Sequence, residues 1–225
     1  MKALIVVTSH ADLGSTGKKT GYYLPEVTHP FFELVDKGIE VDIASIKGGK
    51  APMDEGSRSL TDPANKRFLE SKAFAALLEN TKKLEAVNAE DYQAIIFAGG
   101  HGTMWDFAQT KAVASVAEGI YRRGGVVAAV CHGPAALVNL KNEDGSPLVR
   151  GKRLATFSNA EEEAAGLTKF VPFLLESEFK KLGARYESAP LWQEKVVVDG
   201  RLVTGQNPAS AAGVGEEVAK LLSNL

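Results

Sequence analysis

The chain has 225 residues, of which 44% are apolar and 24% are charged, and its net charge at pH 7 is −2. These values are typical of a single globular domain spanning residues 1–225 with a sizeable buried core, and they exclude a disordered chain. The slight negative charge provides no general attraction to nucleic-acid phosphates or anionic lipids, so we expect neither nucleic acid nor membrane as a partner.

The first predicted element is an apolar strand over residues 3–8, which polar residues follow at once. This run is too short for a signal peptide or a membrane span. Cys131 is the only cysteine, so no intrachain disulfide or cysteine-rich zinc site can form. A reducing cytoplasm therefore suits the chain best.

Strand-like and helical patterns alternate along the chain. Apolar runs predict strands at 3–8, 39–45, 93–98 and 126–130, and a hairpin at 195–198 and 201–204 about an Asp199-Gly200 turn. Helices are predicted at 26–37, 64–78, 111–123, 134–140, 169–182 and 209–222. This alternation indicates an α/β fold, with a mainly parallel, flavodoxin-like sheet sandwiched by helices.

Reactive residues follow three of the predicted strands. His10 follows the first strand, Gly99–Gly102 with His101 follows the third, and Cys131–Pro134 follows the fourth. Ligands of open parallel sheets bind beyond the carboxyl ends of the strands. We therefore expect the only cysteine and three of the four histidines to meet at one edge.

Cys131 lies between an apolar strand and His132-Gly133-Pro134, a pattern typical of a nucleophile elbow. A following helix would favour the thiolate through its dipole, so we expect an acidified, nucleophilic thiol. The structural alternative is a small buried cysteine.

The Gly99-Gly100 pair allows a close backbone approach, so the amides of Gly100 and His132 are expected to form an oxyanion hole. The alternative is a tight turn. A dinucleotide loop is excluded because the third glycine of that motif is missing, and we expect no cofactor and no metal site.

Three segments, Gly21–Pro30, Ala98–Asp106 and Ala129–Pro134, resemble the ThiJ/PfpI superfamily, whose fold is that of class I glutamine amidotransferases. The resemblance runs nearly end to end. Within the superfamily, these segments and Val203–Ser210 are similar to the heat-shock-chaperone branch. That branch contains glutathione-independent glyoxalases, also called glyoxalase III or D-lactate dehydratase. The resemblance further implies a homodimer.

By this resemblance Glu26 is the carboxyl group beside the nucleophilic sulfur. Burial near a thiolate would keep this group protonated, so that it donates a hydrogen bond to sulfur or carries a proton. The residues alone favour a different interpretation, a helix start after Pro25 at which Glu26 complements the helix dipole.

The acid that orients His132 is one of three consecutive glutamates, Glu161, Glu162 and Glu163. The family spacing favours Glu162. The two acids not used are expected on a solvated helix start, which Asn159 would cap. The sequence leaves two interpretations open for six aromatic and histidine residues, which either take part in the site or only pack in the fold. They are His10, Tyr22, Tyr23, His29, His101 and Trp105.

The resulting hypothesis is a cofactor-free glyoxalase of the D-lactate dehydratase type, in which Cys131 attacks methylglyoxal or a similar small 2-oxoaldehyde and forms a hemithioacetal. His132 or Glu26 then moves a proton between adjacent carbons. The alternatives are a stress-induced holdase chaperone or thiol redox sensor and, less favoured, an amidase, peptidase or protein deglycase.

Overall fold

The structure is a computed structural model that describes residues 1–225. Its main sheet has seven strands in the order β3-β2-β1-β4-β5-β9-β8, and all neighbours are parallel except β8 and β9. The strands are β1 Lys2–Val7, β2 Glu40–Ser45, β3 Lys82–Lys83, β4 Ala94–Phe97, β5 Val126–Val130, β8 Val196–Asp199 and β9 Leu202–Gly205. Two short strands, β6 Arg153–Leu154 and β7 Arg185–Tyr186, form a separate parallel pair.

The α-helices are α1 Pro25–Val35, α2 Pro63–Glu70, α3 Lys72–Glu79, α4 Thr103–Asp106, α5 Lys111–Arg122, α6 Asn159–Ala164, α7 Leu175–Lys181 and α8 Ala211–Leu222. Short 3₁₀ helices are η1 Glu55–Ser57, η2 Leu84–Ala86, η3 Ala89–Asp91, η4 Gly133–Leu137 and η5 Pro208–Ser210. None of the helices is long and apolar enough to cross a membrane.

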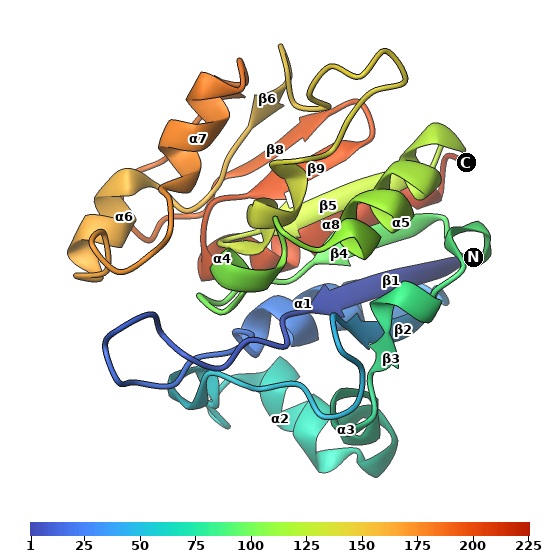
Figure 1. Ribbon diagram of the computed structural model, residues 1–225. Coiled ribbons are helices and arrows are strands. Elements are labelled where there is room, and N and C mark those ends of the chain that lie inside the picture. The colour runs from blue at the N-terminus through green and yellow to red at the C-terminus, as the bar shows by residue number, and fades with distance from the viewer.

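Helices cover both faces of the sheet, with α1 and α8 packed together on one face and α5 on the other (Figure 1). The strands between them are apolar on both faces, and every residue of β4 and β5 is buried. The predicted mainly parallel sheet between helices is therefore confirmed. A glycine, Gly215, lets α8 approach α1, since a Cβ atom there would lie 2.6 Å from Cα of Pro30.

Three predicted helices were wrong in extent or type. The helix predicted at 64–78 is two helices, because the Ser71 side chain accepts a hydrogen bond from the amide of Phe74 and starts a new helix. Only residues 175–181 of the predicted 169–182 helix are helical. The predicted 134–140 helix is the 3₁₀ helix η4, in which the amide of Ala135 donates to the carbonyl of His132.

The hairpin is present, but its strands begin one residue later than predicted. Asp199 pairs with Leu202, so the two loop residues are Gly200 and Arg201. Gly200 has φ of +61°, a conformation that suits glycine.

The parallel strands all end at the same edge of the sheet. The arrowheads of β1, β4 and β5 point towards the side of the molecule where α4 lies (Figure 1). The turns after β4 and β5 are neighbours there, because these strands pair directly. This edge contains the candidate site.

Candidate active site

Cys131 follows the last residue of β5 and has φ of +60°, a left-handed conformation that is strained for a residue other than glycine. The turn is held on both sides: the Cys131 amide donates to the carbonyl of Gly205 at 2.9 Å, and the Phe157 amide donates to the carbonyl of Cys131 at 3.0 Å. The sharp turn predicted from the sequence is therefore present.

Glycines allow the turns after β4 and β5 to pack against each other. A Cβ atom on Gly133 would overlap the carbonyl of Phe97, and one on Gly99 would lie 2.8 Å from the amide nitrogen of His132 and overlap the Glu26 carboxyl. Gly100 has φ of +99°, and a Cβ atom there would lie 2.6 Å from the amide nitrogen of Tyr23. No larger residue fits at these three positions without moving the backbone.

The same two turns present the amides that the sequence assigned to an oxyanion hole. Neither the Gly100 amide nor the His132 amide donates a backbone hydrogen bond. The hydroxyl of Thr103 lies 2.9 Å from the carbonyl oxygen of Gly100 and 3.0 Å from that of His132. Thr103, to which the sequence gave no role, thus ties the two turns together.

His132 connects the thiol to a carboxylate. Its Nδ1 atom lies 3.3 Å from Sγ of Cys131, and its Nε2 atom lies 2.7 Å from Oε2 of Glu162. In the neutral ring, Nε2–H donates to the carboxylate, which leaves Nδ1 as an acceptor facing the thiol. The structure thus brings Cys131, His132 and Glu162 together as expected.

A second histidine shares the same carboxylate. Nε2 of His101 lies 2.8 Å from Oε1 of Glu162, and the His101 and His132 ring centroids are 3.9 Å apart. Burial opposes ionisation of Glu162, but His132 and His101 outweigh it and lower the pKa of Glu162 to about 2. Burial and the neighbouring His101 lower the pKa of His132 to about 4, so this ring is neutral at neutral pH.

Glu26 lies in the first turn of α1 and is fully buried. Neither carboxyl oxygen makes a hydrogen bond of ordinary geometry, although the Cys131 thiol and the Gly99 amide lie close enough to favour the charged form slightly. Burial dominates and raises the pKa of Glu26 to about 8, so the group carries a proton at neutral pH.

The expected acidification of Cys131 was wrong. Burial, together with the neighbouring Glu26, raises the pKa of the thiol well above its usual value. A helix dipole was expected to favour the thiolate, but η4 is a five-residue 3₁₀ helix with only a small dipole. The resting site therefore holds a protonated thiol beside a protonated carboxyl group.

The three consecutive glutamates have three different environments. Glu162 contacts the histidines, whereas Glu163 is exposed as expected. Glu161 was wrongly placed on a solvated helix start, because it is fully buried. Ser158, rather than the predicted Asn159, caps α6 and forms a capping box with Glu161.

Glu161 also holds two loops that border the site. Its Oε1 atom accepts hydrogen bonds from the amide of Trp192 at 3.0 Å and from the side-chain amide of Asn207 at 2.9 Å. Trp192 has φ of +64°, so this bond fixes an otherwise strained conformation. The sequence carried a signal for this role, since Ser158 and Glu161 have the spacing of a capping box.

The thiol opens into a cavity of about 520 Å³. Its lining includes residues that the sequence did not single out, namely Leu13, Phe157, Leu167, Trp192 and Asn207. The Phe157 ring lies 4.2 Å from the His132 ring and 5.7 Å from that of Trp192. The cavity thus combines an apolar wall with the polar relay.

The aromatic and histidine residues that the sequence left open do not all lie at the active-site cavity. Tyr23 lines the cavity, whereas Tyr22 lines a separate one. His10 stacks on Trp105 at 5.2 Å, and His29 is 2.8 Å from Asp62, away from the thiol.

Two histidines and a carboxylate also make up a set that can hold a metal ion. The ligand atoms of His101, His132 and Glu162 lie within 4.8 Å of one another. In the structure, however, the carboxylate already accepts a hydrogen bond from each ring.

Comparisons with known proteins agree with the geometry. A family model described as the DJ-1/PfpI family matches residues 19–221. The glutathione-independent glyoxalase HSP31 of Saccharomyces cerevisiae is 38% identical over 99% of this chain and 98% of its own length. Among solved structures, glyoxalase III of Candida albicans is 34% identical with a TM-score of 0.90 over 98% of this chain and 97% of its own. The 24 kDa Rapid Encystment Protein of Francisella tularensis is 43% identical with a TM-score of 0.95, over 98% of both chains.

We expect Glu26→Gln to stabilise the protein increasingly as the pH rises. The folded wild type keeps its Glu26 proton up to about pH 8, whereas the unfolded chain loses it near 4.5. The wild type therefore loses stability between these values, by on the order of a few kcal/mol, and the glutamine variant does not. Urea unfolding of both proteins from pH 4 to pH 8 measures the difference. A difference that does not change with pH would show that Glu26 is charged in the folded state.

Proposed function

This chain belongs to the DJ-1/PfpI family, and we propose that it is a glutathione-independent glyoxalase that converts methylglyoxal or a similar 2-oxoaldehyde into a 2-hydroxy acid. The observation that carries this proposal is the buried relay from Cys131 through His132 to Glu162, with protonated Glu26 beside it. The relatives named glyoxalases, which align over almost the whole chain, support the same activity.

In the first step, the Cys131 sulfur attacks the aldehyde carbon of the substrate. Nδ1 of His132 accepts the thiol proton as the carbon–sulfur bond forms, and Glu162 stabilises the resulting imidazolium. Since the thiol is protonated at rest, proton transfer accompanies the attack. The aldehyde oxygen becomes an alkoxide, which the amides of Gly100 and His132 stabilise until it takes a proton from the His132 imidazolium or from Glu26. The group that gives up this proton is then free to act as a base.

In the second step, the hemithioacetal rearranges. A base, His132 or Glu26, removes the proton from the carbon bonded to sulfur, and the electron pair moves towards the neighbouring carbonyl to form an enediol. Protonation of the neighbouring carbon then gives a 2-hydroxyacyl thioester. One carbon is oxidised and the other reduced, so the rearrangement needs no outside electron donor or acceptor.

In the last step, water attacks the thioester and releases the 2-hydroxy acid and the free thiol. The net reaction is the addition of one water molecule to the oxoaldehyde. The residues of this chain supply the nucleophile, the acids and bases and the oxyanion amides, so we propose that no metal, nucleotide or glutathione is needed. The mechanism requires a reduced thiol, which suits the cytoplasm.

We expect Cys131→Ala to abolish lactate formation from methylglyoxal, because no other thiol is present to form the intermediate. Lactate is followed by NMR without glutathione or added metal. His29→Ala is a suitable control, since His29 lies on the same helix as Glu26 but bonds to Asp62 away from the cavity, and it should keep full activity. Substantial lactate formation by the alanine variant at position 131 would disprove the covalent mechanism.

Two neighbouring glutamates provide a matched test of the relay. Glu162→Gln should lower kcat by roughly 10²-fold or more, because the amide cannot stabilise the His132 imidazolium and does not fix the ring tautomer. Glu163→Gln removes the same charge from an exposed position one residue away and should leave kcat unchanged. Equal kinetic parameters for the two variants would remove Glu162 from the mechanism.

A further inference from the structure

A second cavity, of about 570 Å³, lies behind the wall of the active-site cavity. The wall is a pair of extended segments, in which the Tyr22 amide donates to the carbonyl of Pro52 and the Asp54 amide donates to the carbonyl of Tyr22, both at 2.9 Å. Neighbouring residues face opposite sides of this wall. Tyr23 and Asp54 line the active-site cavity, whereas Tyr22 and Met53 line the second cavity.

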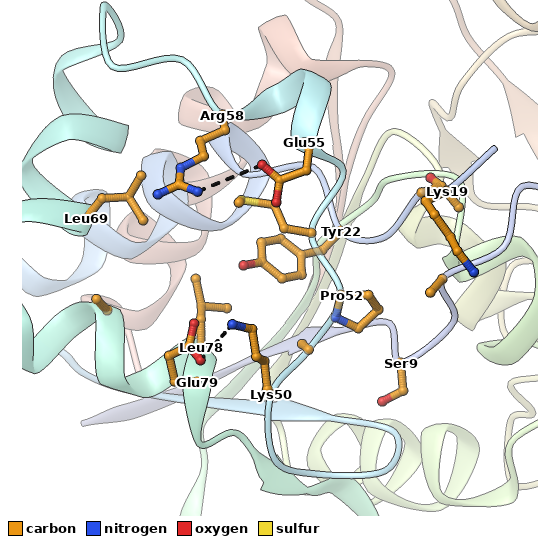
Figure 2. Close-up of a pocket in the computed structure, with 15 residues that line it drawn as sticks. Ser9, Lys19, Tyr22, Lys50, Pro52, Glu55, Arg58, Leu69, Leu78 and Glu79 are labelled. Atoms are coloured by element: carbon orange, nitrogen blue, oxygen red, sulfur yellow. Dashed lines mark ion pairs between the residues drawn. The ribbon is translucent and has the colours of Figure 1, made fainter.

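Tyr22 directs a polar group into this cavity. The residue is only 4% exposed, and its hydroxyl makes no hydrogen bond within the protein. Figure 2 shows its ring pointing into the space between Arg58, Glu55 and Glu79. Burial and the charges of the two glutamates raise the pKa of Tyr22, so the hydroxyl stays protonated as a donor. The hydroxyl is accessible from the cavity and can donate a hydrogen bond to an acceptor group of a ligand there.

Two ion pairs flank the hydroxyl on opposite sides (Figure 2). Arg58 lies 3.9 Å from Glu55, and Lys50 lies 3.1 Å from Glu79. All four side chains are more than half exposed, so each pair contributes little stability and a ligand can replace it at small cost. A third cation of the lining, Lys19, is paired with Asp12, so the charges around the cavity balance, which favours a dipolar ligand over one with a net charge.

The remaining lining of the cavity is largely apolar. Leu69 and Leu78 extend from α2 and α3 towards the Tyr22 ring, and Met53 and Pro52 complete this surface. A short hydrocarbon side chain would bury apolar area here.

We propose that this cavity binds a small zwitterion with an apolar side chain, of the chemical class of a free α-amino acid. The carboxylate accepts hydrogen bonds from the Tyr22 hydroxyl and the Arg58 guanidinium, and the ammonium group donates to Glu79. The apolar side chain packs against Leu69 and Leu78. This site is separate from the Cys131 cavity and does not depend on the activity proposed there.

Isothermal titration calorimetry of the full chain with L-leucine tests the proposal. We expect saturable binding, which Tyr22→Phe weakens about tenfold because a hydrogen bond to a charged group is lost. Tyr121→Phe is the matched control, since it removes a tyrosine hydroxyl at a different pocket, and it should bind leucine like the wild type. Cys131→Ala should also bind normally, which separates this site from the catalytic one.

Two analogues test the need for both charges. We expect 4-methylpentanoate, which lacks the ammonium group, and isoamylamine, which lacks the carboxylate, to bind about tenfold more weakly than leucine or worse. Arg58→Met at the exposed rim gives a second variant whose folding is not at risk, and it should weaken leucine binding about tenfold. The proposal is wrong if leucine shows no saturable binding, or if the Tyr22 and Arg58 variants both bind leucine as tightly as the wild type does. It is also wrong if the wild type binds 4-methylpentanoate as tightly as leucine.

Discussion

The close approach of the two turns that follow β4 and β5 is the constraint on which the site depends. Gly99 and Gly133 allow this approach, because a Cβ atom on either would overlap the backbone of the other turn, and Gly100 allows residues 21–23 to pack against the same place. As a result, the Cys131 thiol, two amides that donate to no backbone carbonyl and a buried carboxyl group share one largely buried space. In such a space a charge persists only where a partner compensates it, so the neighbours of each group decide where its proton resides.

Two buried glutamates show how this rule assigns different roles to the same residue type. Glu162 accepts hydrogen bonds from two imidazole rings and stays ionised, whereas Glu26 has no such partner and stays protonated up to about pH 8. One carboxyl group is therefore suited to stabilise a cation and the other to donate a proton. Such divergent pKa values are typical of acid–base pairs in enzymes. An unpaired buried acid also lowers the folding stability at neutral pH, which is the usual compromise at a functional site.

Much of this arrangement could be predicted from the sequence, since apolar runs alternate with helical patterns and reactive residues follow the strands. That pattern predicts that Cys131, His132 and Gly100 lie at the edge of the sheet. The resemblance to a known family was needed to identify Glu26 and Glu162 as the acids of the site. The acidic run misled us about Glu161, because hydropathy places charged residues outside and does not register the capping box that buries this side chain. Phe157 and Trp192 were missed because they come from irregular loops, where no periodicity indicates which side chains face inward. The apolar pattern also did not show that Cys131 is buried beside Glu26, so the thiol pKa was predicted in the wrong direction.

In the proposed mechanism Cys131 becomes covalently acylated during turnover, and this acyl-enzyme can be trapped. Protein mixed with ¹³C-labelled methylglyoxal is quenched in acid within a single turnover, digested and examined by mass spectrometry. We expect a labelled 2-hydroxyacyl thioester on the Cys131 peptide, from which hydroxylamine releases lactohydroxamate. A simple hemithioacetal cannot yield that product. Lactate formation at the normal rate with no acyl group on Cys131 would rule out the thioester intermediate.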